Sequence, residues 1–502
     1  MARSRGHDPT SRRRDGAGGP ALRFHDRGRQ HRGPRAQPAT AELARCGCGV
    51  GRMSATSATG PLADIRVLEF TTAWAGPFAG RCLAYMGADV IKVEAPEHPD
   101  SWRGPRSGGA AGYYPELTPE PDPQNRNLLF NSQNLGKRSL ALDLKRPGAM
   151  EIMRGLVRDA DVILANFTPG VLDRLGIGRR DLAAVNDRII VVEMPAFGPG
   201  GPSSGHQGMG KTMEPAAGMT ALMAYPDGTP VLTGPAVMDP TGGLNAVAAI
   251  VSALELRERT GRGSSVMVPQ VEAAASWIGE FVLEQAETGR TWRPHGNHVP
   301  YAAPHGAYPC QGEDQWVAIA VHDDEQWRAL CAELGADELA ADPAWFELPN
   351  RLADQDRLDE ALSRLTATHD KTALAHRLQR AGVPAAPVLN GREIALSPEM
   401  RQAGMVAELD HPAVGTRTYS TLAFRHSRTP GGHRRAAPLF GEHNDDVLAD
   451  LLGYDGDHIA SLRANGVIAD VPVADTDTPR ATRTDNASTS AQPTTDEGSD
   501  DS

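Results

Sequence analysis

The sequence between residues 65 and 94 reads IRVLEFTTAWAGPFAGRCLAYMGADVIKVE. Short apolar runs lie at its two ends, at 65–70 and 88–94, and runs of this length and composition are typical of buried strands. Between them, residues 77–86 have the composition of a helix, and Pro77 suits the first helical position. Strand, helix and strand in this order predict a βαβ unit, in which the two strands are parallel.

A second round of the same alternation follows this unit. Repeated strands and helices predict an α/β fold, in which a mostly parallel, Rossmann-like sheet carries helices on both faces. One predicted helix is long: its apolar residues follow helical spacing, and Gly261 stands where a C-terminal cap belongs. The further strands are expected at 139–144, 161–165 and 188–193, and the helices at 148–159, from 171 to 175, at 242–259, and around 325–334 and 358–381.

Composition divides the chain into parts. The first 52 residues contain twelve Arg and no Lys and lack the apolar core of a secretory signal, which predicts disorder. Met53 opens the sequence that leads into the first strand, so an over-extended start codon is favoured over a functional basic arm. The expected parts are a disordered Arg-rich extension (1–59), the first part of a large domain (60–290), a smaller α+β domain (291–399), a return to the large domain (400–455), a C-terminal helix or edge (456–470) and a disordered acidic tail (471–502).

Acidic residues outnumber basic residues by 63 to 51, which gives the chain a net charge of −12. Because the excess of arginine is confined to the first 52 residues, the rest is acidic and no nucleic-acid partner is expected. The apolar runs are shorter than the roughly 20 residues of a membrane-spanning helix, so no membrane association is expected. Five cysteines without a disulfide framework or a metal-ligand set favour a reducing, cytoplasmic compartment.

The turn at 72–80 lies where a doubly wound sheet would bind a nucleotide. Gly76 and Gly80 do not have the Gly-x-Gly-x-x-Gly spacing, so a nucleotide-dependent dehydrogenase is only a distant alternative. The sequence also lacks a Gly-x-Ser-x-Gly elbow, a phosphate-binding loop and a His-Glu-x-x-His pair. A loose histidine cluster in a Pro-rich segment is interpreted as surface histidine rather than as a metal site. Its members are His295, His298 and His305.

Asp239 stands immediately before Pro240 at the start of the long helix. Taken alone, the pair is most simply a helix N-cap followed by Pro at the first helical position. The positive end of the helix dipole also favours an ionised carboxylate there, and one carboxylate oxygen stays free to act as a nucleophile. On the residues alone, the capping role is favoured.

A series of blocks between residues 60 and 455 resembles the class III CoA-transferase family, in the family's own order. This family includes formyl-CoA transferase, crotonobetainyl-CoA:carnitine CoA-transferase and the L-carnitine dehydratase/bile acid-inducible protein F group. The blocks are VLEF (67–70), AGPFAG (75–80), GADVIKVE (87–94), KRSLALDLK (137–145), NFTPGVLDRLG (166–176), LRERTGRG (256–263) and PLFGEH (438–443).

The resemblance implies an enzyme that moves CoA from an acyl-CoA donor to a free carboxylic acid, with the CoA thioester as a substrate and with no prosthetic group or metal. It also implies a homodimer whose two chains are interlocked like linked rings. The family's catalytic aspartate falls on Asp239, which reverses the preference for capping alone. The CoA contacts that carry over by position are Ala73, Trp74, Ala75, Leu142, Lys145, Asn166, Phe167 and Arg174.

The implied mechanism repeats two steps. Asp239 attacks the donor thioester to give a mixed anhydride and then an aspartyl-CoA thioester, from which the acceptor acid takes CoA. Developing oxyanions need hydrogen-bond donors, and the nearest candidates in the sequence are the N–H groups of Gly242 and Gly243. Glu214 is a weaker candidate for the acceptor side, with a salt-bridged structural acid as the equal alternative.

The chain departs from the family at two places. Ala95 and Pro96 follow Glu94 where many members have a basic residue, so one phosphate contact is not expected to carry over. The mobile glycine run that covers the active site of formyl-CoA transferase is absent from this sequence, and residues 300–306 stand near its place. Acceptor selection is therefore expected to differ.

The family also contains α-methylacyl-CoA racemases, which use a His and Asp pair for proton transfer. Counting back from Asp239 places Met209 at the expected histidine, three residues after His206. A thioether is no general base, so a racemase is the second candidate, on the condition that the loop at 203–211 does not bring His206 in. A non-catalytic acyl-CoA-binding relative is a more distant alternative.

Overall fold

The computed structural model describes residues 60–225, 227–234 and 236–473. The predicted extension at 1–59, with the alternative start at Met53, lies outside the described residues, as does the predicted tail from residue 474 onward. The described residues have an α/β fold with one large parallel sheet and two smaller antiparallel sheets.

The large sheet has six parallel strands in the order β3-β2-β1-β4-β5-β6. The chain runs outward from β1 to β3 and then starts again at β4, on the other side of β1. The predicted βαβ unit is confirmed as β1, α1 and β2. The elements are β1 (Arg66–Phe70), α1 (Ala75–Tyr85), β2 (Asp89–Glu94), β3 (Arg138–Ala141), β4 (Val162–Ala165), β5 (Ile190–Glu193) and β6 (Ser265–Met267).

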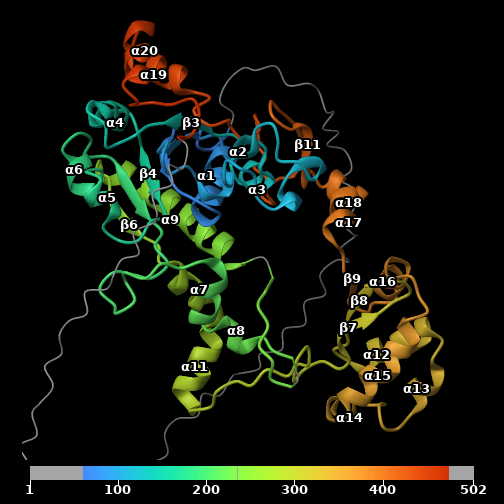
Figure 1. Cartoon of the computed structure of the whole chain (residues 1–502). Helices are drawn as coiled ribbons and strands as arrows, with labels where there is room; N and C mark the ends of the chain where they lie inside the picture. The colour runs from blue at the N-terminus through green and yellow to red at the C-terminus, as the bar shows by residue number, and fades with distance from the viewer. Residues whose placement is uncertain (1–59, 226, 235, 474–502) are drawn as a thin grey trace, which may run out of the picture. The chain divides into compact units, whose positions relative to one another are not determined.

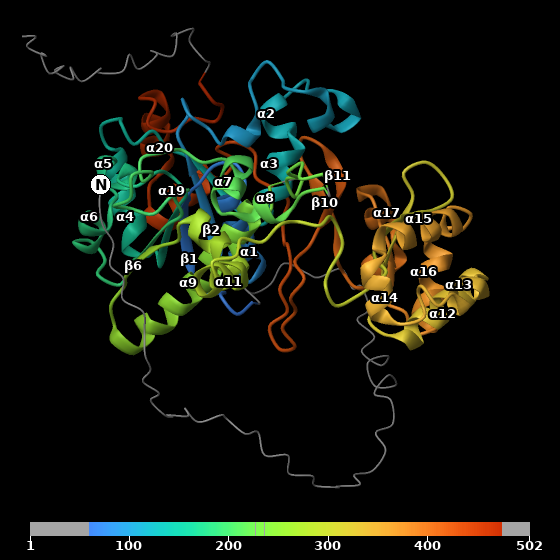
Figure 2. The same cartoon turned by 90° about the horizontal axis from the view of Figure 1, so that it is seen from below.

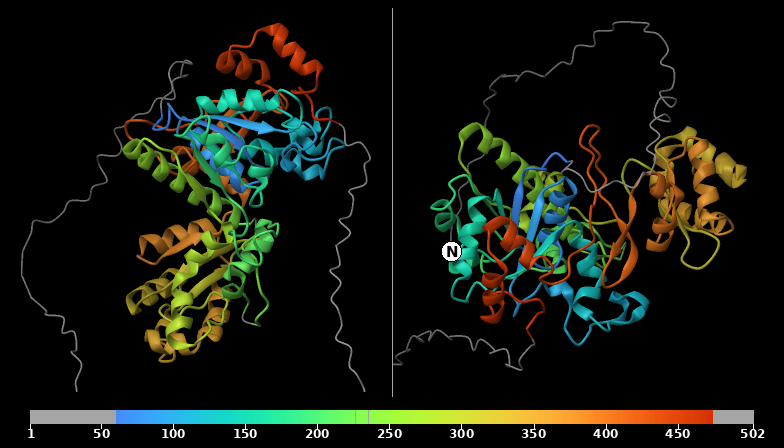
Figure 3. Two further views of the ribbon diagram at one scale, coloured as in Figure 1. Left: turned by 90° about the vertical axis from the view of Figure 1, so that its left-hand side faces the viewer. Right: turned by 90° about the horizontal axis from the view of Figure 1, so that it is seen from above.

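Helices cover both faces of this sheet, as the alternating sequence predicts. Successive strand residues point to opposite faces, so Val67 and Leu68 belong to different hydrophobic cores. The Leu68 core includes α4 (Ala149–Arg158), α19 (Asn444–Leu452) and α20 (Gly456–Ala464), and the Val67 core includes α1 and α9 (Met238–Thr260). Figure 2 shows α1 and α9 close together, and the left view of Figure 3 shows helices on either side of the sheet.

The C-terminal helices α19 and α20 return to the large sheet. They lie near α4, although they come from the opposite end of the chain (Figure 1). The Asn444 side chain accepts a hydrogen bond from the Ala141 N–H of β3 at 2.8 Å and donates to the Ala469 carbonyl at 2.9 Å. The last described residues therefore belong to the same core as the first strands, while the domain boundaries stay a prediction.

Three elements differ from the sequence expectation. Helix α9 begins at Met238 instead of residue 242, and the short strand β6 was not expected. The segment 358–381 forms two helices, α15 (Gln355–Thr366) and α16 (Lys371–Arg380), instead of one. The second helix has its own start because the Asp370 side chain accepts hydrogen bonds from the N–H groups of Thr372 and Ala373.

The segment between the two parts of the large-sheet region forms an antiparallel sheet in the order β7-β8-β9, with its own core around Trp327. Strands β10 and β11 form a separate hairpin. Within the described ranges, the helices are too short or too polar to cross a membrane. The remaining elements are α2 (Pro123–Arg126), α3 (Leu128–Gln133), α5 (Val171–Arg174), α6 (Arg179–Ala183), α7 (Gly210–Ala216), α8 (Met219–Leu222), α10 (Gln270–Ala275), α11 (Gly279–Thr288), β7 (His305–Pro309), β8 (Trp316–Ala320), α12 (Asp324–Leu334), α13 (Asp337–Ala341), α14 (Leu348–Ala353), β9 (Ala385–Pro387), α17 (Gly391–Leu396), α18 (Pro398–Gln402), β10 (Val406–His411) and β11 (Gly415–Ser420).

Candidate active site

The strands β1 and β4 lie side by side at the centre of the large sheet, where the strand order reverses. Doubly wound sheets bind their ligands at this switch point, outside the carboxyl ends of the strands. Asn166, the first residue after β4, accepts a hydrogen bond from the Thr72 N–H at 2.9 Å and donates to the Thr72 carbonyl at 2.8 Å. The loops that follow the two strands are therefore fastened to each other.

The turn that follows β1, at 71–75, contains a strained residue. Ala73 has a φ of 63°, in the left-handed region that residues with a Cβ rarely adopt. Its N–H donates to Oδ1 of Asp100 at 2.9 Å. Gly76 allows the turn to close tightly, because a Cβ there would lie 2.5 Å from the Thr71 side chain. These contacts fix the place of Ala75, the first residue of α1.

Asp239 lies in the first turn of α9, and its carboxylate meets the start of α1. It is the second helical residue rather than the N-cap, which is Val237, so the capping prediction is wrong because α9 begins earlier than expected. The backbone N–H of Ala75 lies near the carboxylate, close enough to lower its pKa. The N-terminal turns of α9 and α1 therefore both meet at this side chain, and both helix dipoles favour its negative charge.

Burial raises the pKa of Asp239 to about 6, while hydrogen bonds from the backbone N–H groups of Ala75 and of Asp239 itself oppose the rise. Among the residues that the structure describes, no charged side chain contributes to this shift. The carboxylate is thus mostly ionised above pH 6 and poorly solvated. An ionised but weakly hydrated carboxylate is suited to nucleophilic attack.

Gly210, the first residue of α7, packs directly against Asp239. A Cβ at this position would clash with Oδ2 of Asp239, so the chain needs glycine here. The neighbouring Met209 is 71% exposed, and the exposed His206 packs edge-on against Phe197 with 6.3 Å between the ring centroids. The described loop therefore brings a glycine, and not a histidine, to the carboxylate.

Gly242 and Gly243 lie inside α9, beyond its first turn. Their N–H groups are in register with the carbonyls four residues earlier, so the helix itself provides their acceptors. A Cβ on Gly243 would lie 2.8 Å from Phe78 and 2.9 Å from the carbonyl of Ala75, which shows that this glycine permits the close approach of α1 and α9. The geometry gives the two glycines a packing role, and the N–H groups that lower the pKa of Asp239 are those of Ala75 and of Asp239 itself.

Glu214 is fully buried in α7. One of its oxygens accepts from the Thr233 N–H at 2.9 Å and the other from the Thr233 hydroxyl at 2.8 Å. Its observed partner is therefore a threonine and not the cation of a salt bridge. Glu214 fastens the segment that leads into α9, and its role toward an acceptor stays a prediction.

A pocket of about 360 Å³ lies at the carboxyl ends of β1 to β4. Leu142 and Phe167 line it with other apolar side chains, and such walls suit a flat aromatic ring. Lys145 is also on its wall, where it pairs with Glu97 at 3.6 Å and stays 67% exposed. The sequence prediction thus contains three residues that the structure brings to one pocket.

The other predicted CoA contacts lie near this pocket without lining it. Trp74 and Ala75 belong to the switch-point turn together with Ala73, and Asn166 fastens that turn. Arg174 ends the short helix α5 with its side chain exposed to solvent. The predicted residues therefore gather at two adjoining places, the apolar pocket and the switch-point turn.

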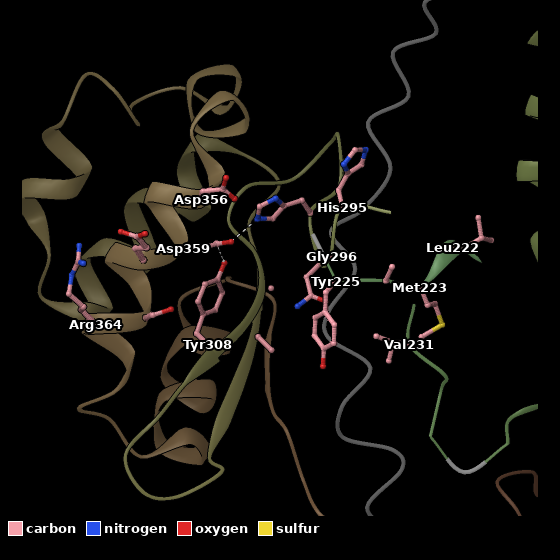
Figure 4. Close-up of a pocket in the computed structure, with 17 residues that line it drawn as sticks. Leu222, Met223, Tyr225, Val231, His295, Gly296, Tyr308, Asp356, Asp359 and Arg364 are labelled. Carbon is pink, nitrogen blue, oxygen red and sulfur yellow. Dashed lines mark hydrogen bonds and ion pairs between the residues drawn. The ribbon is translucent and has the colours of Figure 1, made fainter. Parts of the chain in front are cut away.

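The predicted histidine cluster is held by other side chains. His298 Nε2 lies 2.7 Å from Asp359 Oδ2. The Tyr308 hydroxyl donates to Asp359 Oδ1 at 2.6 Å (Figure 4). His305 contacts the carbonyl of Asn297 at 2.6 Å. No group of three or more metal-ligating side chains in the described part of the chain could hold a metal ion.

The sequence analysis missed a set of buried charges beneath the switch-point turn. Glu69, Lys92 and Lys137 are fully buried, and both lysines pair with Glu69, Lys92 at 3.3 Å and Lys137 at 2.8 Å. The available signal was the pairing of β1 with β2, which places Glu69 opposite Lys92. Charged residues inside two apolar strands that pair in parallel are a mark of such a cluster.

The profile of CoA-transferase family III matches residues 62–444. The chain is 31% identical over 419 residues to a succinyl-CoA–D-citramalate CoA-transferase of Chloroflexus aurantiacus. This match covers 83% of this chain and 100% of that protein. It is 30% identical over 434 residues to a formyl-CoA:oxalate CoA-transferase of Rhodopseudomonas palustris, and this match covers 82% of this chain and 98% of that protein.

The fold agrees with these sequence relatives. A solved structure of a CAIB/BAIF family protein from Brucella suis matches with a TM-score of 0.71 and 28% identity, over 78% of this chain and 100% of that one. The matched region contains the large sheet, the switch-point turn and Asp239. With both its sequence and its fold matched over most of its length, the chain belongs to CoA-transferase family III and is a CoA-transferase.

Proposed function

We propose that this CoA-transferase moves CoA from an acyl-CoA donor to a small carboxylic acid, with Asp239 as the covalent nucleophile. The observation that carries the proposal is the setting of the Asp239 carboxylate. It lies in the first turn of α9 and near the Ala75 N–H, and has a pKa raised by burial to about 6. Such a group is ionised at neutral pH and has little water to shed before it attacks.

In the first half of the reaction, an oxygen of Asp239 attacks the carbonyl carbon of the donor thioester. The C–S bond breaks, which leaves a mixed anhydride and the CoA thiolate. The thiolate then attacks the side-chain carbonyl carbon of Asp239 and expels the donor acid. The product of this half is an aspartyl-CoA thioester.

In the second half, the carboxylate of the acceptor acid attacks the aspartyl-CoA thioester and releases the thiolate. The thiolate then attacks the acyl carbon that came from the acceptor. This step forms the product acyl-CoA and returns Asp239 as a carboxylate. One thioester is exchanged for another, so water is neither consumed nor formed in the overall reaction. Water has to be excluded from the site because it would hydrolyse the anhydride and thioester intermediates.

The Ala75 N–H has a specific task in this scheme. Each attack on the side-chain carbon of Asp239 places negative charge on an Asp239 oxygen, and the Ala75 N–H lies near this carboxylate. A donor that is fixed before the charge develops stabilises it without reorganisation. Ala75 therefore takes the oxyanion role that the sequence had suggested for Gly242 and Gly243.

The CoA moiety is proposed to lie between the apolar pocket and the switch-point turn. Leu142 and Phe167 would hold its adenine ring, and Lys145 would exchange its partner Glu97 for a phosphate group. Arg174 is a second phosphate partner, since its guanidinium is exposed. The turn at Ala73–Ala75 and Asn166 would meet the end of CoA that carries the thioester.

The acceptor is proposed to be a short carboxylic acid. The two relatives above are named for transfers that involve succinate, citramalate, formate and oxalate, three of which are dicarboxylic acids. We place Glu214 close to the acceptor side, as a residue that shapes the segment before Asp239. The proposed assembly is an interlocked homodimer in the cytoplasm, which works without a prosthetic group.

The test is a screen of the purified protein with formyl-, acetyl- and succinyl-CoA as donors against a panel of mono- and dicarboxylic acids, read by mass spectrometry. The proposal predicts a new acyl-CoA only when donor and acceptor are both present, and none with Asp239→Asn. If the protein instead exchanges the α-proton of a 2-methylacyl-CoA with solvent and transfers no CoA, it is a racemase and the proposal is wrong.

A further inference from the structure

Four charged side chains lie fully buried beneath the switch-point turn. This charge cluster consists of Glu69, Lys92, Asp100 and Lys137. Lys92 lies 2.8 Å from Asp100 and 3.3 Å from Glu69, and Lys137 lies 2.8 Å from Glu69. A buried ionic cluster is costly to desolvate and often stabilises the fold no more than apolar packing would. Stability alone therefore does not explain why these charges lie beneath the turn.

The charge cluster holds the backbone at both ends of the turn. At the first end, Lys92 donates to the carbonyl of Thr71 at 2.9 Å, and the Thr71 hydroxyl donates to Glu69 at 2.6 Å. At the other end, Lys137 donates at 2.8 Å to the carbonyl of Pro77, in the first turn of α1. Both ends of the segment that carries Ala75 are therefore anchored to buried charge.

Asp100 holds the middle of the turn. Its Oδ1 accepts from the N–H of Ala73 and from the N–H of Trp102, both at 2.9 Å, while its Oδ2 pairs with Lys92. Its own N–H donates to Glu94 at 3.0 Å, so its backbone is fixed as well. The Thr72 hydroxyl also donates to Oδ1, at 3.3 Å. A carboxylate accepts from all of these groups, whereas the NH2 of an amide at this position would face the Lys92 ammonium.

The anchored residue is the strained one. Ala73 keeps a φ of 63°, which a residue with a Cβ adopts only when its surroundings impose it. Two residues later, the Ala75 N–H reaches Asp239. A relaxed Ala73 would rotate the following peptides and turn this N–H away from the carboxylate.

We infer that Asp100 is a positioning residue of the transferase, which holds the strained turn so that the Ala75 N–H stays directed at Asp239. The inference rests on the proposed function, because it takes Asp239 to be the nucleophile. It assigns the charge cluster a task in catalysis through the backbone of the turn. Asp100 itself touches neither Asp239 nor the reacting atoms in this scheme.

The experiment compares Asp100→Asn with a matched control, Asp161→Asn. Like Asp100, Asp161 pairs with a backbone N–H, that of Arg66 at 2.7 Å, and with a cation, the guanidinium of Arg257 at 2.8 Å, but it lies at the opposite ends of the strands. For both variants, kcat and the pH dependence of kcat/KM are measured with the best donor and acceptor. Hydrogen exchange of the amides at 72–75 and circular dichroism report the turn and the fold.

For Asp100→Asn, the Ala75 N–H is expected to turn away from the Asp239 carboxylate, so that only the N–H of Asp239 itself still opposes the effect of burial. The acid limb of kcat/KM is expected to move up by about half a pH unit or more, and kcat to fall about tenfold or more. The amides at 72–75 are expected to exchange faster. Asp161→Asn is expected to change neither the acid limb nor the exchange at the turn, because its carboxylate has no link to Ala75.

A rescue separates positioning from a general loss of stability. Adding Lys92→Gln to Asp100→Asn replaces the cation by an amide. Its oxygen accepts from the new Asn, which frees the Asn oxygen for the Ala73 N–H, and its NH2 supplies a donor for the Thr71 carbonyl in place of Lys92. The double variant is expected to recover the acid limb of the wild type. An acid limb that stays at its wild-type position in a folded Asp100→Asn variant would overturn the inference.

The proposed function is checked in the same samples. If the wild type forms a covalent intermediate on Asp239 and Asp100→Asn behaves like the control, the inference alone is wrong. If the wild type turns over without any modification of Asp239, the proposed function fails and the inference fails with it.

Discussion

Replacing Asp239 by Asn is expected to stabilise the folded protein at neutral pH while it removes transfer. Burial raises the pKa of this carboxyl from 3.8 to about 6. Between these two values the folded chain keeps a proton that the unfolded chain has lost, so stability falls as the pH rises. The contribution of the neutral carboxyl is complete below pH 4 and is lost as the pH rises through 6. Asn carries no charge and shows no such loss.

The size of the effect follows from the shift. About two pKa units at 1.36 kcal/mol per unit correspond to a ceiling of about 3 kcal/mol well above pH 6. Roughly half of this loss falls between pH 5 and pH 8, since the unfolded carboxyl is already ionised at pH 5. Asn keeps the shape of the side chain and an oxygen for the Ala75 N–H, so other differences between the two proteins are nearly independent of pH.

The assay is urea unfolding at pH 5, 6, 7 and 8 with one protein concentration throughout. The free energy of unfolding of Asp239→Asn, minus that of the wild type, is expected to increase by about 1.5 kcal/mol from pH 5 to pH 8. Asp181→Asn, at an exposed acid in α6, is the control and is expected to give a constant difference. A constant difference for Asp239→Asn as well would refute the argument from burial.

The remaining predictions concern the site. In the wild type, kcat/KM is expected to rise with pH through about 6, because only the ionised Asp239 attacks; a profile that is flat from pH 5 to pH 8 would contradict this. Gly210→Ala is expected to lower kcat strongly by displacing the Asp239 carboxylate, while Gly201→Ala, whose added Cβ meets open space, is the control and should leave kcat unchanged. Arg174→Ala is expected to raise the donor KM by about fivefold, or about 1 kcal/mol for an exposed charge-assisted phosphate bond, and an unchanged KM would make Arg174 a surface charge. In deuterated water without acceptor, a 2-methylacyl-CoA is expected to keep its α-proton, and rapid uptake of deuterium would favour the racemase.

The sequence predicted the large sheet well because its strands are continuous apolar runs between helices. It also placed Asp239 at the start of the long helix. It missed the true start of α9, since Pro240, Gly242 and Gly243 are poor helix formers when read alone. Only the packing of these glycines against Gln270 and Phe78 shows why the helix tolerates them.

The charge cluster escaped the sequence analysis for a different reason. Glu69 and Lys92 each stand inside an apolar strand, and neither has a partner nearby in the sequence. Their pairing depends on the register of β1 and β2, and Lys137 joins them from a third segment. The link between Ala75 and Asp239 depends likewise on the packing of α1 against α9. Contacts of this kind follow from the assembled fold and not from local patterns.

The central claim is that Asp239 becomes covalently modified during turnover. The direct measurement incubates the protein with donor acyl-CoA without acceptor, traps the intermediate with hydroxylamine or borohydride, and maps the modified peptide by mass spectrometry. The account predicts a modification on the peptide that contains Asp239, and none in Asp239→Asn. An unmodified Asp239 peptide in an enzyme that is shown to be turning over, or transfer at the wild-type rate by Asp239→Asn, would contradict it.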